Sequence, residues 1–217
     1  MAFSNYFIKA THEYNDFDSF VPAPYFRKSI TFDESGKLSL TVACCGFYEL
    51  YLNGKRVTKG RLAPYISNPD HIIYADSYTF DVEKGETVIG LHLGNGFVND
   101  PAGHPWGFEK ARFRSAPSFS LSGEFVGESG EKTEFDADGF KTHPSPIIFD
   151  EFRLGERYDA RLELPGWCDR SFDDSDWNAP IKAEVPRGEI RLCTAEPILP
   201  QYELKPVSVT KRGNVFR

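Results

Sequence analysis

The sequence predicts an all-β protein, an antiparallel β-sandwich or barrel, on three observations. Aromatic residues, which favour strands, are frequent: 19 Phe and 10 Tyr occur among 217 residues. Turn formers are frequent as well, with 18 Gly and 15 Pro. Apolar residues alternate with a period of two in several short runs, and no stretch keeps a helical period beyond a turn or two. Many short strands separated by turns are typical of a sandwich or barrel.

Four runs carry the alternation most clearly. They are Leu38, Leu40, Val42 and Cys44; Tyr48, Leu50 and Leu52; Ile89, Leu91 and Leu93; and Phe119, Leu121 and Phe125. Successive side chains of a strand point to opposite faces of the sheet, so each run lines a single face. We expect these faces to be buried.

Turn signals separate the expected strands, at residues 33–36, 53–54, 84–85, 94–96, 127–130 and 138–139. Asn53-Gly54 lies between two strand-like runs and predicts a hairpin, because both residues tolerate positive φ. The stretch 173–177 predicts a single helical turn. There Asp173 caps the turn while Phe172 and Trp177 pack inward.

The chain changes character at Pro180. Strand-like pieces at 181–185, 190–193 and 207–210 are broken by prolines, which predicts an edge strand followed by an extended connector. The apolar residues of 215–217 then predict a strand that is cut at its start, and hence a truncated chain. We therefore expect a lead-in segment over 1–19, a sandwich over 20–180, and an edge strand with a connector over 181–217.

Charge and targeting signals exclude several classes of protein. Lys and Arg number 25 against 32 Asp and Glu, a net charge of −7, so a basic field for nucleic acid is absent. No apolar run is long enough to span a membrane, and the first ten residues lack the pattern of a signal peptide.

The four cysteines form no C-x-x-C pair, which argues against a zinc site. We expect reduced thiols in a cytoplasmic protein.

The common catalytic patterns find little support. No serine lies in a G-x-S-x-G elbow, and no H-x-H, H-E-x-x-H or EF-hand pattern occurs, so neither a catalytic residue nor a metal site is predicted. Asp150 and Glu151 are adjacent on a predicted strand and point to opposite faces, so they cannot act together on one glycosidic bond. Gly94-Asn95-Gly96 lacks the third glycine of a dinucleotide fingerprint and predicts a tight turn that needs positive φ.

Sugar binding is the remaining functional hypothesis. Aromatic faces hold the C–H surfaces of sugars, and planar polar groups hold their hydroxyls. Loop or strand-end aromatics that could do so are Phe97, Trp106, Tyr158 and Trp167, with Tyr65 as a further example. Asp159 and Arg161 would share a strand face and could grip a polyol or each other. The alternative is that these aromatics pack in the core or between domains.

Several segments together resemble a known family. They are PAPYFRK at 22–28, FYELYLNGKRVTKGRL at 47–62, YADSYTFDV at 74–82, ETVIGLHLGNGF at 86–97 and ERYDARLELPGW at 156–167, followed by FDDSDW. Their order and spacing are similar to the N-terminal β-sandwich of bacterial α-L-rhamnosidases, the glycoside hydrolase family 78 type. The resemblance covers roughly residues 20–180. FDDSDW alone also resembles the N-terminal sugar-binding-like domains of family 2 glycosidases.

The resemblance implies a jelly-roll-like, galactose-binding-like sandwich ahead of a second β domain and an (α/α)6 barrel. In this family the barrel holds the catalytic acid and base, so the resemblance implies no catalytic residue in this chain. The implied partners are the remaining domains of the parent glycosidase and rhamnosides. A non-catalytic domain that binds carbohydrate and a purely structural domain of the same enzyme both stay open.

Some members of the family use this sandwich as a calcium-dependent rhamnose-binding module, with acidic or Asn residues in the loop after NGKRV. Here that loop reads Thr58-Lys59-Gly60-Arg61. Lysine and arginine are poor neighbours for calcium, which prefers oxygen ligands. We therefore expect no cofactor and no metal.

Overall fold

The computed structural model describes residues 3, 6–101, 103, 105–213 and 215–216, and side chains as far as Lys211. The described strands are β1 (Phe7–Lys9), β2 (Pro24–Phe32), β3 (Gly36–Cys45), β4 (Phe47–Leu52), β5 (Lys55–Arg56), β6 (Ile72–Val82), β7 (Gly85–Gly94), β8 (Ser118–Gly127), β9 (Lys132–Asp136), β10 (Lys141–Pro144), β11 (Ile147–Glu151), β12 (Gly155–Tyr158), β13 (Ile181–Ala183), β14 (Glu189–Leu192), β15 (Lys211–Arg212) and β16 (Val215–Phe216). Three short 3-10 helices, η1 (Gly96–Asn99), η2 (Phe108–Lys110) and η3 (Ala160–Leu162), complete the elements.

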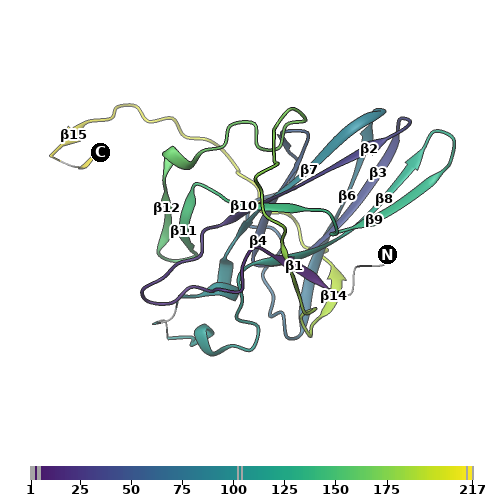
Figure 1. The fold of residues 1–217 in the computed structure, drawn as a ribbon. Coiled ribbons are helices and arrows are strands. Elements are labelled where there is room, and N and C mark those ends of the chain that lie inside the picture. The colour runs from purple at the N-terminus through teal and green to yellow at the C-terminus, as the bar shows by residue number, and fades with distance from the viewer. Residues whose placement is uncertain (1–2, 4–5, 102, 104, 214, 217) are drawn as a thin grey trace.

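Two sheets make the sandwich (Figure 1). The larger sheet has seven strands in the order β13-β1-β8-β3-β6-β14, with β9 paired to β8. The smaller sheet has five strands in the order β10-β2-β7-β4-β5. Nearly all pairs are antiparallel, and β14 pairs with β6 in parallel. The all-β sandwich predicted from the sequence is confirmed.

The main core lies between the two sheets and is made by the predicted alternating runs. Leu38, Leu40 and Val42 of β3 are almost fully buried, and they share the interior with Leu50 of β4 and Leu91 of β7. A second, smaller core covers the other face of the larger sheet, around Phe7, Ala43, Cys45, Ile73, Ala75 and Val98. The larger sheet is therefore buried on both faces in the part that the second core covers, which explains why β3 becomes continuously buried toward its end.

The hairpin predicted at Asn53-Gly54 is confirmed. Asn53 has φ of 49° and Gly54 has φ of 79°, the left-handed pair that a two-residue turn of this kind requires. The turn connects β4 to β5, with Leu52 opposite Lys55. Asn53 also accepts a hydrogen bond from the Val88 amide with its side-chain oxygen, at 2.8 Å, which ties the turn to β7.

Residues outside the predicted 20–180 sandwich also join the larger sheet. β1 comes from the predicted lead-in, and β13 and β14 come from the predicted connector, where they form the two opposite edges. Of the strand-like pieces in the predicted edge strand and connector, those at 181–185 and 190–193 contain strands, whereas 207–210 is irregular and Val207 is fully exposed. Residues 207–210 do not pair with a strand of the sandwich, because the chain beyond Pro200 extends away from the two sheets (Figure 1).

Other predictions fall near the end of the chain or in the turns. Residues 215–216 form β16, paired with β15, but Arg217 lies outside the described residues, and the side chains of 215–216 are not described either.

The stretch 173–177 forms a hydrogen-bonded turn in which Asp173 accepts from the Ser175 amide at 3.0 Å. Trp177 is buried against Phe172, as predicted. None of the described residues forms a helix that is long and apolar enough to cross a membrane.

Candidate functional site

The structure places the six predicted sugar-contact residues in two regions. Phe97 lies in the short helix η1, and Trp106 lies in the connection between η1 and η2. Tyr158 is the last residue of β12. Asp159, Arg161 and Trp167 lie along the segment that follows β12 and crosses the outer face of the smaller sheet.

Phe97 and Trp106 belong to what we call the loop-end aromatic cluster, formed by Phe97, Trp106, Phe108 and Phe152. The Phe97 ring centroid lies 5.0 Å from that of Phe152 and 5.3 Å from that of Phe108. The Phe108 ring stacks on Trp106 at 6.5 Å. The three contributing loops follow β7, precede β8, and connect β11 to β12, so the cluster ties together segments far apart in sequence.

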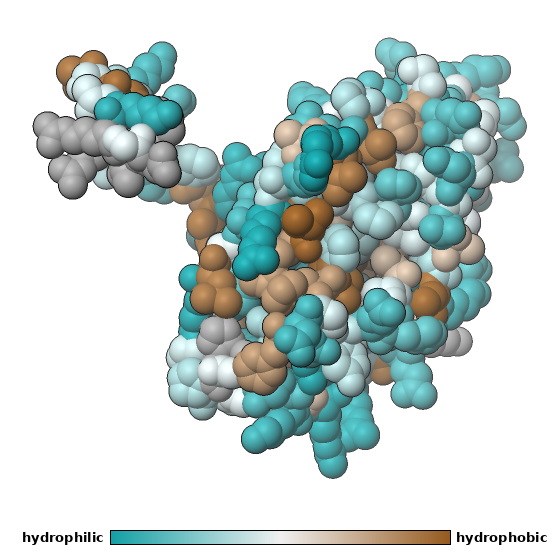
Figure 2. All heavy atoms as spheres, turned by 60° about the vertical axis from the view of Figure 1, so that its left-hand side comes forward, coloured by the Kyte–Doolittle hydropathy of each residue, from teal (hydrophilic) through white to brown (hydrophobic). Residues whose placement is uncertain are grey.

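The cluster faces outward and is predominantly apolar. Trp106 is 51% exposed and Phe152 is 45% exposed, and the neighbouring Leu154 is 65% exposed. The guanidinium carbon of Arg153 lies 3.1 Å from the Trp106 ring centroid, so a cation already covers part of the indole. Figure 2 shows apolar side chains gathering in a band on the side of the molecule that carries β11 and β12. Exposed apolar surface of this kind is typical of contacts with another domain or ligand.

Buried polar groups hold the loops beneath the cluster. The Asn95 amide donates to Asp150 Oδ2 at 2.7 Å, and the Asn95 side chain donates to Asp150 Oδ1 and to the Val21 carbonyl. Burial raises the pKa of Asp150, although the hydrogen bonds from Asn95 act in the opposite direction. The Asn95–Asp150 pair therefore fixes the β7–η1 turn to β11. Gly96, with φ of 52°, begins η1 in the conformation that the sequence predicted for this turn.

Two further asparagines extend the network toward the N-terminus. Asn99 donates to Asn95 through its side chain and accepts from the Asn15 amide at 2.7 Å. Asn15 in turn accepts from the Val21 amide at 2.6 Å. Sequence reasoning missed Asn15, Asn95 and Asn99 as positioning residues. The signal at Asn95, between two glycines, indicated only a turn, and its partners lie 55 and 74 positions away.

Trp167 packs against the outer face of the smaller sheet. Its ring stacks on Tyr25 of β2 with centroids 4.3 Å apart and meets Tyr51 of β4 edge-on at 5.1 Å. Gly90 of β7 makes room, because a Cβ there would lie 2.7 Å from the Trp167 ring and 2.5 Å from Cys168 Sγ. The contacts of Trp167 are those of a packing residue.

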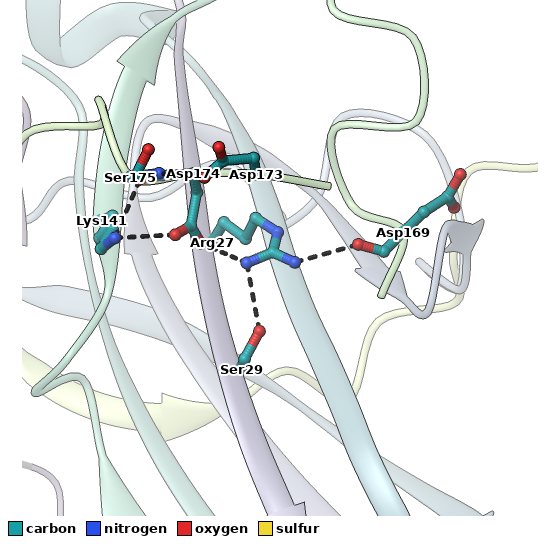
Figure 3. A network of polar contacts seen from close by, with 7 residues as sticks. All are labelled: Arg27, Ser29, Lys141, Asp169, Asp173, Asp174 and Ser175. Atoms are coloured by element: carbon teal, nitrogen blue, oxygen red, sulfur yellow. Dashed lines mark hydrogen bonds and ion pairs between the residues drawn. The ribbon is translucent and has the colours of Figure 1, made fainter. Parts of the chain in front are cut away.

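A charged cluster, the Arg27 clamp (Arg27, Lys141 and Asp174), fastens this covering segment to the sheet (Figure 3). Arg27 is 3% exposed and donates to Asp174, to Ser29 Oγ at 3.1 Å and to the Asp169 carbonyl at 3.0 Å. Lys141 Nζ donates to Asp174 Oδ1 at 2.7 Å. Burial acts to raise the pKa of Asp174, but the Lys141 and Arg27 contacts prevail and lower it. The hydrogen-bond and ion-pair partners of the clamp all belong to this domain, so we assign the clamp a role in stabilising the fold.

The expectation that Asp159 and Arg161 share a strand face was wrong. Asp159 precedes the short helix η3, where its side chain accepts from the Arg161 amide at 3.1 Å and from Arg161 Nε at 2.8 Å. The Arg161 side chain lowers the pKa of Asp159 to about 2. Asp159 is itself extended, as an N-cap residue usually is, and the helical turn that begins at Ala160 removes Arg161 from any strand face. Nearby, the exposed Tyr158 donates its hydroxyl to Glu163 at 2.7 Å.

The side chains of the loop after NGKRV contact other groups of the domain. Thr58 Oγ1 accepts from the Leu50 amide at 2.7 Å, Lys59 Nζ lies 5.1 Å from the Tyr78 ring centroid, and Arg61 pairs with Glu49 at 3.2 Å. Two cationic side chains thus take the place of the oxygen ligands that calcium requires. Across the described ranges, no three His, Cys, Asp or Glu residues come together in a way that could hold a metal ion.

Comparison with known proteins points to one family. The family model described as "Alpha-L-rhamnosidase N-terminal domain" matches residues 35–201. An α-L-rhamnosidase of Formosa agariphila is 32% identical over 166 residues, which cover 71% of this chain and 17% of that protein. An α-L-rhamnosidase of Streptomyces avermitilis is 28% identical over 144 residues, covering 64% of this chain and 14% of that protein. The chain thus spans about a sixth of the length of these relatives.

The fold is similar to part of a solved α-L-rhamnosidase. The structure described as α-L-rhamnosidase from Dictyoglumus thermophilum superposes with a TM-score of 0.80 and 26% sequence identity. The match covers 98% of this chain and 25% of that one.

Proposed function

The chain belongs to the α-L-rhamnosidase N-terminal domain family, and on this premise we propose that it is a non-catalytic accessory sandwich of a larger α-L-rhamnosidase. Such an enzyme hydrolyses terminal α-L-rhamnosyl residues. The sandwich contributes by packing on its neighbouring domains through the loop-end aromatic cluster. The observation that carries this proposal is the outward exposure of Trp106 and Phe152 over a rigidly hydrogen-bonded base.

The contacts of the other predicted residues support packing over sugar binding. Trp167 is stacked on Tyr25, so its ring face is already occupied. Phe97 lines a cavity of only about 30 Å³, which is too small for a sugar ring. Asp159 and Arg161 satisfy each other. Each of these groups is engaged inside the domain and would have to be released before it could hold a ligand.

Carbohydrate binding at the cluster is the second candidate function, because one observation favours it. Trp106 is half-exposed, and an indole that is partly open to solvent can receive the C–H face of a sugar. Binding there would require Arg153 to leave the ring or to contact the sugar from its edge.

The two candidates are separated by calorimetric titration of the 217-residue chain with L-rhamnose, together with a Trp106→Ala variant. Packing alone predicts no saturable heat for either protein. In the parent enzyme, Trp106→Ala and Phe152→Ala then lower the midpoint of thermal unfolding while the isolated chain is little affected. Saturable heat that Trp106→Ala abolishes would instead establish the carbohydrate-binding role.

A further inference from the structure

A groove lined with cationic side chains lies on the side of the larger sheet that carries the second core. It is formed by β1, the loop before β8, and the connection from β13 to β14, and its volume is about 480 Å³. The basic residues that line it are Lys9, His12, Arg112, Arg114, Lys182 and Arg187. Only two carboxylates, Asp70 and Glu184, line it as well. We call it the basic groove.

This concentration of positive charge contrasts with the whole chain, whose net charge is −7. The lining holds five lysine and arginine residues against two carboxylates, even though acidic residues outnumber basic ones in the whole sequence. The Lys182 side chain pairs with Asp138 outside the lining, so Lys9, Arg112, Arg114 and Arg187 supply the charge of the groove. A cleft lined by one sign of charge concentrates ligands of the opposite sign.

Four of the cations take part in no ion pair within the described part of the chain: Lys9, Arg112, Arg114 and Arg187. Lys182, in contrast, pairs with Asp138 at 3.1 Å. Lys9 is half-buried, and its Nζ donates to Ser115 Oγ at 3.2 Å. Burial lowers the pKa of Lys9, so an anion placed beside it would relieve the cost of the buried charge.

Arg114 gives the groove a fixed wall. Its Nη atoms donate to the backbone carbonyls of Glu109 and Asn15, and its guanidinium lies 4.3 Å from the Tyr14 ring centroid. The side chain is therefore held in place before any ligand arrives. Pre-organised cations bind anions more tightly than mobile ones, because less conformational entropy is lost.

The dimensions and chemistry of the groove define its ligand class. A volume of about 480 Å³ lies within the usual range of about 300–1,000 Å³ for small-molecule sites. Guanidinium groups match carboxylates and sulfates through paired hydrogen bonds. We propose that the basic groove binds an acidic oligosaccharide, bearing uronate carboxylates or sulfate esters, through Arg112, Arg187 and Lys9. The choice of a saccharide rests on the proposed function, whereas the anionic character follows from the groove alone.

The test is calorimetric titration of the 217-residue chain with trigalacturonate. The matched neutral probe is the same trisaccharide with its carboxyl groups reduced to alcohols, and the third probe is an octaglutamate peptide. The variant is Arg112→Gln combined with Arg187→Gln. The control variant, Lys55→Gln combined with Lys132→Gln, removes the same number of positive charges from exposed positions outside the groove. All four positions are exposed, so both variants should fold.

The proposal predicts saturable binding of trigalacturonate that weakens about tenfold in the arginine variant and stays unchanged in the lysine variant. Binding should also weaken as NaCl rises from 20 to 200 mM, and the reduced trisaccharide should not bind. Absence of binding, equal binding of the neutral probe, or equal losses in both variants would overturn the proposal. Binding of octaglutamate alone would overturn it in favour of a protein-docking groove. None of these outcomes depends on Trp106 or on rhamnosidase activity, so the two proposals fail separately.

Discussion

Removal of the Arg27 guanidinium should destabilise the domain far more than removal of an exposed cation. Arg27→Met keeps most of the side-chain length but leaves Asp174 with Lys141 as its single cationic partner. It also leaves the Asp169 carbonyl with one donor in place of two, the Phe172 amide at 3.2 Å. Arg27 is 3% exposed and the Asp174 side chain is 20% exposed, so little water can replace the lost contacts. Breaking one side of a buried ion pair costs about 3–5 kcal/mol. We expect about 3 kcal/mol, because Lys141 still neutralises part of the charge.

Urea unfolding followed by tryptophan fluorescence at pH 7 measures this cost. The matched control is Lys37→Met, which breaks the Lys37–Asp81 pair, whose side chains are 67% and 86% exposed. That substitution should change the free energy of unfolding by less than about 1 kcal/mol. A cost for Arg27→Met of less than about 1 kcal/mol, or one equal to the control, would refute the role assigned to the clamp.

The clamp also predicts a direction of pH dependence. The pKa of Asp174 is lower in the folded chain than its ordinary value, so the folded state favours the ionised form. This contribution is present above the ordinary pKa of an aspartate and is lost as the pH falls through the lowered folded value. Asp174→Asn should therefore be less stable than the wild type at pH 7, and the gap should narrow as the pH falls below about 4. A gap that stays constant down to pH 2 would contradict this assignment.

Further substitutions test the packing of the smaller sheet and the thiols. Gly90→Ala should cost at least about 2 kcal/mol in urea unfolding, because its Cβ would overlap Trp167 and Cys168; a neutral effect would contradict the packing described. Burial lowers the pKa of His92 to about 4, so the unfolded state binds more protons between about pH 4 and 6.5. Stability should fall by about 1–2 kcal/mol on acidification from pH 7 to 5, and by less in His92→Gln; an equal fall in both proteins would contradict this. Cys193 should react first with a thiol reagent at pH 8, because the other three thiols are buried with raised pKa values, and fast labelling in Cys193→Ser would contradict this.

The sandwich could be predicted from the sequence because its evidence is local. The alternating run around Leu40 and the Asn53-Gly54 turn each lie within a few residues, and both appear in the structure as expected. The family resemblance was equally accessible, since it depends on short segments in a fixed order.

The candidate site could not be predicted to the same depth, because its contacts are distant in sequence. Asn95 hydrogen-bonds to Asp150, which lies 55 positions away in the sequence. Arg27 pairs with Asp174, which lies 147 positions away. The sequence left Trp167 open between sugar contact and packing, because nothing near it in sequence shows that Gly90 leaves a space beneath its ring. The Asp159 error has a local cause, since an N-cap residue and a strand residue share an extended backbone and only the residues that follow distinguish them.

The central claim, a non-catalytic sandwich within an α-L-rhamnosidase, is tested most directly by hydrolysis of an aryl α-L-rhamnoside. The purified 217-residue chain and the full-length protein from the same gene would be assayed at equal molar concentration. We predict release of the aryl alcohol by the full-length protein and no release above the buffer rate by the chain. Turnover by the chain alone, or none by the folded full-length protein, would contradict the claim.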